Sequence, residues 1–231
     1  MDPFESRENP FALSTGDLMA ALLLMFVLLL SATLLVIKDN EEETKSIVEA
    51  YEALQDALYQ DLLIEFDSDL ERWAADLDRE TLSIRFYEPQ VLFEQGDATV
   101  RPVFAQILAD FFPRYITILQ QDRYRNHIEE IRIEGHTSSE WGEGLSEDAS
   151  YFNNMALSQN RTRSVLQYVL TTINPDNERE WTRRLITANG LSSSQPILRD
   201  GAEDPNASRR VEFRVRTDAE QQISDILQRL R

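Results

Sequence analysis

The chain has 231 residues and a formal net charge of -18 at pH 7, because 41 acidic residues stand against 23 basic ones. That charge repels nucleic acids and anionic lipid headgroups, so DNA and RNA are poor candidate partners. There is no cysteine and there are two histidines, which excludes disulfide bonds and thiolate catalysis and argues against a zinc site. The length fits one globular domain together with an anchor and a connector.

An uncharged apolar run occupies residues 18–37. Its 20 residues would form a helix about 30 Å long, enough to cross the hydrocarbon core of a bilayer. Residues 1–10 carry three acids against one arginine, which is unlike a cleavable signal peptide. We therefore expect a retained transmembrane helix over residues 11–38. Basic residues on both sides of the run leave its orientation open at this point.

Asp17 stands directly before this apolar run. One interpretation is functional, because an ionisable group at the edge of the hydrocarbon costs free energy and commonly carries ions or protons. The other is structural: Ser14, Thr15, Gly16 and Asp17 would form an N-cap cluster that starts the helix, with Asp17 accepting backbone N–H groups. The residues alone do not separate the two.

Residues 39–79 contain neither glycine nor proline, and their apolar residues recur at steps of three and four. This spacing predicts a helical connector, residues 39–80, with one apolar stripe. The stripe favours pairing of two copies of the chain, although Asp61 and Glu65 interrupt a strict pairing seam. The double substitution Leu58→Asp plus Leu62→Asp would test this pairing. The alternative is that the stripe packs against the globular domain of the same chain.

From residue 81 the pattern changes to alternating strands and helices. Strands are predicted at 82–86, 129–134, 184–188 and 210–216, and helices at 100–119 and 154–170. Polar loops are predicted at 138–153 and 191–207, and a terminal helix or tail at 219–231. The expected fold class is an N-terminal transmembrane helix, a long helical connector and an α+β domain in which helices pack on a mixed sheet.

Four patches of residues 82–217 resemble the OmpA-like peptidoglycan-binding domain in order and spacing. They are Gly135-His136-Thr137, Asn154-x-x-Leu157-Ser158-x-x-Arg161-x-x-x-Val165, Gly190 with Pro196-Ile197, and Arg209-Arg210-Val211-Glu212. The resemblance implies that residues 81–218 form this domain and bind the diaminopimelate of a peptidoglycan stem peptide. A planar guanidinium suits a carboxylate of such a ligand.

By position, the resemblance assigns carboxylate binding to Arg161, with Asn154 and Leu157 shaping the pocket and Arg210 supporting it. The alternative for both arginines is a surface ion pair. Ser138 stands where the family has an aspartate, and a neutral hydroxyl does not form the same ion pair with an amine.

A negative charge near Ser138 would have to come from elsewhere in the loop, and Glu140, Glu143 and Asp148 are the candidates. His136 is expected to be a buried scaffold residue without a catalytic role.

The N-terminal half is similar to the B subunit of MotA/MotB-type stator units, on the residues Asp17-Leu18-Met19. Within that group the short N-terminus and the acidic connector are most similar to the ZorB subunits of Zorya anti-phage systems. The resemblance implies a homodimer inside a pentameric ring of multi-span A subunits, in a bacterial inner membrane. The N-terminus would be cytoplasmic and the C-terminal domain periplasmic, and Asp17 would carry H⁺ by default or Na⁺.

Two rival functions remain open from the sequence. The first is a passive tether of the OmpA type between membrane and cell wall. In that case Asp17 only caps a helix and no A-type partner is needed. The second is a flagellar stator subunit. No nucleophile constellation, phosphate-binding glycine loop or metal-ligand cluster indicates an enzyme, and no bound cofactor is expected.

Overall fold

The structure is a computed structural model that describes residues 10–87, 92–94, 96–141, 144–173 and 176–218. The chain divides into two compact units, Met1–Ala50 and Tyr51–Arg231. The first helix, α1 (Pro10–Leu70), contributes to both units. The predicted terminal segment 219–231 lies outside the described residues.

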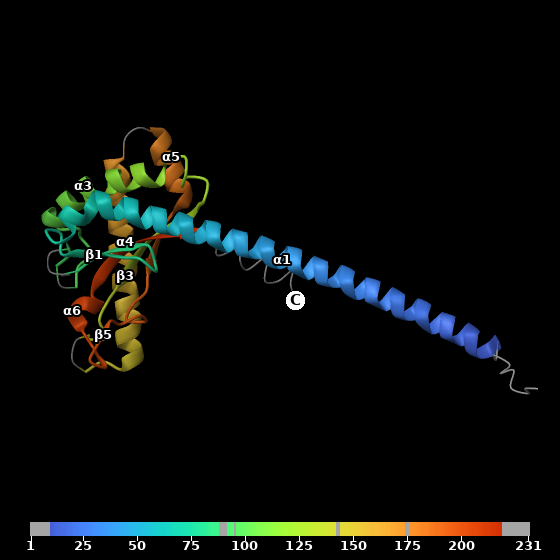
Figure 1. The fold of residues 1–231 in the computed structure, drawn as a ribbon. Coiled ribbons are helices and arrows are strands. Elements are labelled where there is room, and N and C mark those ends of the chain that lie inside the picture. The colour runs from blue at the N-terminus through green and yellow to red at the C-terminus, as the bar shows by residue number, and fades with distance from the viewer. Residues whose placement is uncertain (1–9, 88–91, 95, 142–143, 174–175, 219–231) are drawn as a thin grey trace, which may run out of the picture. The chain divides into compact units, whose positions relative to one another are not determined.

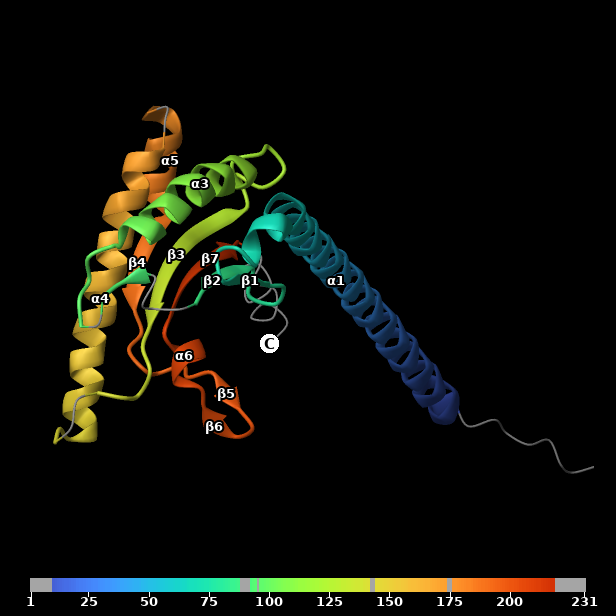
Figure 2. The same ribbon diagram turned by 90° about the vertical axis from the view of Figure 1, so that its left-hand side faces the viewer.

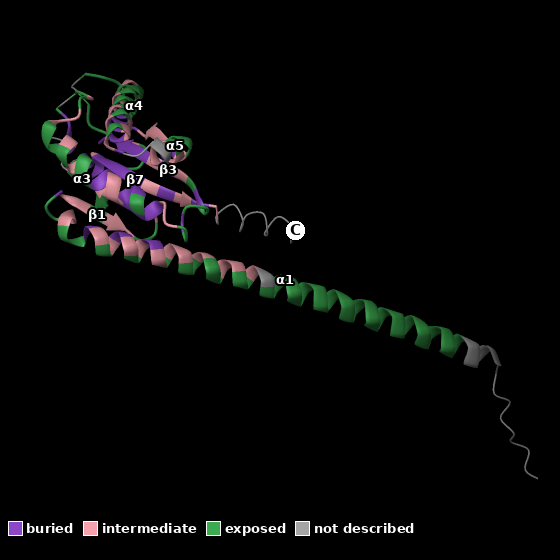
Figure 3. Ribbon diagram, turned by 90° about the horizontal axis from the view of Figure 1, so that it is seen from above, coloured by how far each residue is buried: buried purple, intermediate pink, exposed green. Residues whose placement is uncertain are grey.

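In the first unit, α1 presents the apolar residues 18–37 with exposed side chains (Figure 3). It is the one helix among the described residues that is long and apolar enough to cross a membrane. Because the helix begins at Pro10, Asp17 lies within it and is not its N-cap. The interpretation of residues 14–17 as the N-cap of the helix is therefore wrong.

The second unit is built on a five-stranded mixed sheet in the order β1-β2-β7-β3-β4 (Figures 1 and 2). Strands β1, β2, β7 and β3 pair antiparallel, and β3 and β4 pair parallel. The strands are β1 (Ala75–Asp78), β2 (Ser83–Phe86), β3 (Ile128–His136), β4 (Ile186–Gly190) and β7 (Arg210–Thr217).

Helices α3 (Pro102–Leu119) and α4 (Glu147–Thr172) cover the apolar face of this sheet. Phe111 of α3 contacts Phe86 and Phe213 of the sheet, with ring centroids 5.2 and 5.1 Å apart. Helix α5 (Asp176–Leu185) leads into β4, and a hairpin of β5 (Leu198–Arg199) and β6 (Ala202–Glu203) precedes the short α6 (Pro205–Ser208). The α+β fold class is confirmed.

The part of α1 that belongs to the second unit packs against α3. Leu58, Leu62 and Phe66 have no exposed surface and lie in the core of this unit. The two acids that interrupt the stripe also join this packing: Asp61 pairs with Arg123, and the Glu65 carboxylate accepts a hydrogen bond from Arg114 Nε at 2.6 Å. Over residues 51–70 the stripe therefore contacts its own domain, which was the alternative to pairing.

Residues 71–80, which we assigned to the helical connector, also belong to the domain. The helix ends at Leu70, and β1 forms the edge of the sheet. Ala74 and Leu82 adopt positive φ angles of 50° and 49°, so the turns lack the glycines that would have marked them. The apolar spacing continues through the turn because Trp73 is buried against Phe66 and is 5% exposed.

Two other boundaries differ from the prediction. Helix α4 begins at Glu147, inside the predicted loop 138–153, because the Ser146 hydroxyl caps it by accepting from Ala149 N at 3.2 Å. The second loop, 191–207, contains the β5–β6 hairpin and α6.

Candidate functional site

The residues with the family motifs meet where β3 and β4 end beneath α4. Gly135 and Gly190 are register partners on these strands, and a Cβ on either would collide with α4. The close approach brings Ser158 against the strand ends, where its hydroxyl accepts from Ser192 N at 3.1 Å. The motif residues of α4 therefore lie over the strand ends, close to the loop that follows β3.

Arg161 is 8% exposed and its guanidinium lies over the Phe93 ring, 4.9 Å from the centroid. Its Nε donates to the carbonyl of Asp97 at 2.9 Å and its Nη2 to that of Glu94 at 3.2 Å. Burial lowers the pKa of Arg161 to about 10, so it is charged at neutral pH. No carboxylate of the described residues forms an ion pair with it. The charge of Asp97 favours the charged form of Arg161 from beyond ion-pair distance. A buried cation without a directly paired carboxylate suits an anionic ligand.

Asn154 and Ser138 join α4 to the end of β3. Asn154 is 2% exposed, and its Nδ2 donates to the backbone carbonyl of Ser138 at 3.1 Å. The Ser138 side chain is also buried, and its Oγ accepts from Arg209 Nη1 at 3.2 Å. Leu157 is half-buried. Asn154 therefore positions the loop after β3.

Arg210 is not a surface ion pair, because it is 7% exposed and its donors are engaged inside the domain. Its Nε donates to Glu212 Oε1 at 2.5 Å, and its Nη1 donates to the carbonyls of Ser208 at 3.1 Å and Gln195 at 3.3 Å. Arg210 thus holds the start of β7 in place, and it lines one small cavity together with Arg161 and Ser158.

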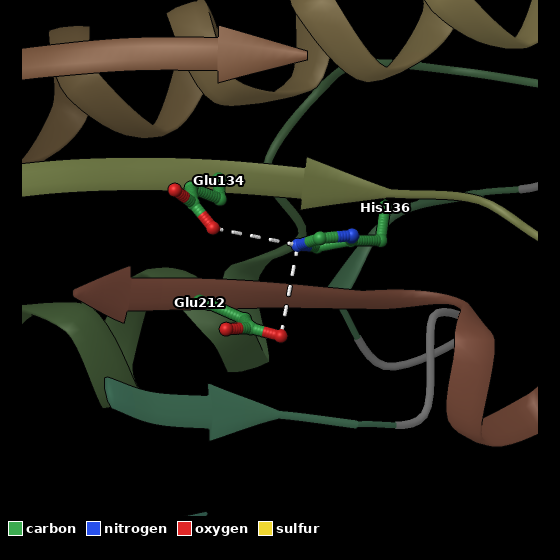
Figure 4. A group of neighbouring side chains, drawn as sticks. All are labelled: Glu134, His136 and Glu212. Carbon is green, nitrogen blue, oxygen red and sulfur yellow. Dashed lines mark ion pairs between the residues drawn. The ribbon is translucent and has the colours of Figure 1, made fainter. Parts of the chain in front are cut away.

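His136 lies with Glu134 and Glu212 on the charged face of the sheet (Figure 4). His136 Nε2 is 3.8 Å from Glu134 Oε2 and 3.6 Å from Glu212 Oε1, and neither ring nitrogen has a hydrogen-bond partner among the described residues. Burial raises the pKa of Glu134, but the charges of His136, Arg214 and Arg132 outweigh it and hold that pKa below its usual range.

The ligand atoms of these three side chains lie within 4.8 Å of one another, which is close enough to surround a metal ion. A cation would compete there with protein cations, because Arg210 Nε lies 2.5 Å and Arg85 Nε 3.4 Å from Glu212 Oε1. The arginines already compensate the buried carboxylates. We therefore interpret the cluster as a buried ion-pair network that orders the strand ends.

Two residues at the site were not singled out from the sequence. Arg209 contacts Ser138 and Glu140, and the Glu203 carboxylate accepts from Ser139 N at 3.0 Å. Arg209 belongs to the Arg-Arg-Val-Glu motif, so the sequence indicated its place at the start of the last strand. The sequence did not indicate which residues its side chain contacts. Glu203 lies 64 residues after Ser139 in a loop without a repeating pattern, and no local signal indicates it.

Asp17 lies in the first unit, one residue before the exposed apolar segment of α1. Its side chain is exposed, and no described residue forms an ion pair or hydrogen bond with its carboxylate. A carboxylate that enters a membrane in this position therefore has no ion-pair partner among the described residues.

Solved structures share the fold of the second unit. A MotB-like protein from Desulfovibrio vulgaris superimposes with a TM-score of 0.50 and 22% identity, covering 75% of this chain and 98% of that one. A cell wall anchor of the type VI secretion system from Pseudomonas aeruginosa is also similar, with a TM-score of 0.46, 21% identity and coverage of 68% and 96%. The second unit is an OmpA/MotB-like domain, joined in this chain to an apolar N-terminal helix.

A sequence relative identifies the particular family. Zorya protein ZorB from Escherichia coli is 46% identical over 227 residues, covering 98% of this chain and 96% of that protein. The chain therefore belongs to the ZorB family. A comparison with general protein-family models matched none of them.

Proposed function

We propose that the chain is the B subunit of an ion-driven membrane motor of the MotA/MotB type, in Zorya anti-phage defence. The observation that carries the proposal is the joining, in one chain, of an apolar helix containing Asp17 to an OmpA/MotB-like domain, with similarity to ZorB over both parts. Relatives of this kind are anchors and not enzymes, and catalysis is no part of the proposal.

In the membrane, Asp17 is the ion carrier. Protonation neutralises the carboxylate and lets it face an apolar wall, whereas the charged form requires a polar path, so alternation between them couples ion entry to movement. The membrane potential supplies roughly 2.3 kcal/mol per charge per 100 mV, which is comparable to the cost of moving a carboxylate at the hydrocarbon edge. The carried ion is H⁺, and Na⁺ is the alternative.

Two copies of the chain stand within a pentameric ring of multi-span A subunits. The N-terminus is cytoplasmic and the domain is periplasmic, so the protein spans the inner membrane once. The partner ring provides the polar path and the apolar wall that a single helix lacks. The exposed residues 18–37 offer the surface for this ring.

In the periplasm, Arg161 binds a carboxylate of the peptidoglycan stem peptide and anchors the stator. Burial, the lack of a carboxylate within ion-pair distance among the described residues and the stacking on Phe93 support this role. Replacement by lysine keeps the charge but removes the planar fork, so Arg161→Lys is expected to weaken binding to purified sacculi about tenfold or more. Sacculus binding equal to that of the unchanged chain would remove Arg161 from the site.

The carrier role is tested by expressing the chain with its genomic multi-span neighbour and comparing Asp17→Asn with the unchanged chain. We expect loss of phage protection and of ion flux in proteoliposomes, while the complex still assembles. Asp39→Asn is the matched control, because Asp39 lies beyond the other end of the apolar segment and is expected to retain both activities.

The outcomes separate the rival functions. Unchanged flux and protection with Asp17→Asn would reject the carrier role and favour a passive tether between membrane and wall. Restored motility of a stator-deficient strain, without phage protection, would instead favour a flagellar stator subunit.

A further inference from the structure

The stem-peptide site as assigned from the sequence lacks a negative charge. In a stem peptide, the free end of diaminopimelate carries an ammonium group beside its carboxylate, and Ser138 provides only a neutral hydroxyl for that ammonium group. The structure shows that this hydroxyl is already used, because its Oγ accepts from Arg209 Nη1 at 3.2 Å. The ammonium group therefore requires a carboxylate from another element.

Glu203, at the end of the β5–β6 hairpin, brings a carboxylate to this position. Its Oε1 accepts from Ser139 N at 3.0 Å and its Oε2 accepts from Ser139 Oγ, directly beside Ser138. An ionised carboxylate has about four lone-pair sites, so these bonds leave capacity for one further donor. Glu203 is half-buried, and among the described residues no basic side chain forms an ion pair with it.

The other acids near the loop are less suited to this role. Glu140 is 66% exposed at its side chain and already pairs with Arg209, at 3.4 Å from Nη1. Asp148 is exposed in the first turn of α4, and Glu143 lies outside the described residues. Glu203 is thus the carboxylate held against the strand end without a cation of its own.

Arg209 brings a second guanidinium to the same site. Its side chain is 26% exposed, and its charge is close enough to Arg161 to disfavour the charged form of that residue. A ligand carboxylate between two guanidinium groups would relieve this repulsion. Arg210, by contrast, directs its donors to Glu212, Ser208 and Gln195.

We infer that Glu203 binds the ammonium group and that Arg209, together with Arg161, binds the carboxylate of the diaminopimelate. This inference rests on the proposed wall-anchoring function. It adds Glu203, which lies outside the family motifs, and gives a binding role to Arg209, which lies within one of them but had no role assigned. The hairpin then determines ligand selectivity: it makes the site specific for a ligand with both charges.

The test uses the full chain in detergent, with binding to purified sacculi competed by meso-diaminopimelate or by pimelate, which lacks both ammonium groups. Glu203→Gln keeps an acceptor for Ser139 but loses the charge. We expect it to weaken competition by meso-diaminopimelate about tenfold or more, as for loss of a charge-assisted hydrogen bond, and to leave pimelate within twofold. Arg209→Gln is expected to weaken both ligands.

Glu140→Gln is the matched control and is expected to change neither ligand more than about twofold, since exposed charge pairs contribute little. Unchanged meso-diaminopimelate binding by Glu203→Gln would overturn the inference and leave the wall-anchoring function standing, provided that the unchanged chain binds sacculi. Equal losses for both ligands with a lower melting temperature would assign Glu203 a structural role and also overturn it. Failure of the unchanged chain to bind sacculi would overturn both proposals.

Discussion

Gly135 and Gly190 face each other as register partners on the parallel strands β3 and β4, and α4 lies directly against both. A Cβ on Gly190 would lie 2.3 Å from Gln159 N, and a Cβ on Gly135 would lie 2.7 Å from Thr162 Cγ2. The absence of both side chains lets the helix approach, so the pair determines where Arg161 stands over the strand ends.

Gly190→Ala is therefore expected to destabilise the domain. The colliding atom belongs to the helix backbone, so α4 must shift, and overpacking of this kind costs about 1–3 kcal/mol. The measurement is urea unfolding of the full chain in detergent, followed by tryptophan fluorescence. Binding to sacculi should also fall, because a shift of α4 displaces Arg161.

Gly16→Ala is the matched control, because a Cβ at Gly16 would meet nothing within 4 Å. Alanine favours a helix more than glycine does, so no loss of stability is expected. A Gly190→Ala variant as stable as the unchanged chain would show that the close approach of α4 is not required.

Periodicity predicted which elements exist better than where they end. The strand over 210–216 was found from strict alternation, and the structure has it at Arg210–Thr217. The end of α1 was missed because Trp73 continues the helical spacing past Leu70 into the core. Apolar spacing reports burial, and a residue in a turn is buried as readily as one in a helix.

The family resemblance supplied Arg161 and Asn154 as candidate site residues. Their spacing of seven along α4 places them on one face of that helix, and both are buried in the structure. Glu203 reaches Ser139 across 64 residues, through a hairpin of two-residue strands. Contacts of this kind depend on how distant elements pack, and neither spacing nor composition encodes them in a single sequence.

The stripe on α1 leads to a prediction about stability. Leu62 is fully buried in the domain core, so Leu62→Ala is expected to lower the free energy of unfolding by about 2–5 kcal/mol. Ile64, on the same helix, is 79% exposed, and Ile64→Ala is expected to change it by less than about 0.5 kcal/mol. Chemical unfolding of both variants checks the difference.

The same pair of variants distinguishes a core from a pairing seam. If Leu62→Ala dissociated a dimer while the domain kept its stability, the packing of residues 51–70 against their own domain would be contradicted. Leu58→Asp plus Leu62→Asp, which we proposed as a test of pairing, is now expected to unfold the domain, because both side chains have no exposed surface.

Arg210 and Glu212 are expected to act as a stability pair. Arg210→Met leaves the Glu212 carboxylate buried without its closest cation, which costs about 3–5 kcal/mol when a buried pair is broken. Replacing both residues by methionine is expected to recover most of that loss, because no unpaired charge remains.

Arg199→Met is the control for Arg210. Arg199 pairs with Asp204 at 3.1 Å, but its side chain is 73% exposed, so the expected change is less than about 1 kcal/mol. A double-mutant cycle from urea unfolding gives the coupling of Arg210 with Glu212. A coupling near zero would show that the two side chains do not stabilise each other.

Acid is expected to destabilise the domain through the carboxylates of β3. For Glu130, burial acts to raise the pKa, but the hydrogen bond from Thr187 and the charges of Arg132 and Arg216 outweigh it, so the folded-state pKa lies below the unfolded value of 4.5. The pKa of Glu134 is also lowered. Such groups stabilise the folded state fully above pH 4.5, and the contribution is lost as pH falls through the lower folded-state pKa values.

Thr187→Val tests this assignment, because it removes the 2.8 Å hydrogen bond from Thr187 Oγ1 to Glu130 Oε1 without changing a charge. The folded-state pKa of Glu130 should rise toward its unfolded value. The variant should therefore be less stable at pH 7 and lose less stability on acidification than the unchanged chain. The measurement is the melting temperature of both proteins from pH 7 to pH 3. Parallel curves for the two proteins would show that Glu130 does not contribute to the acid sensitivity.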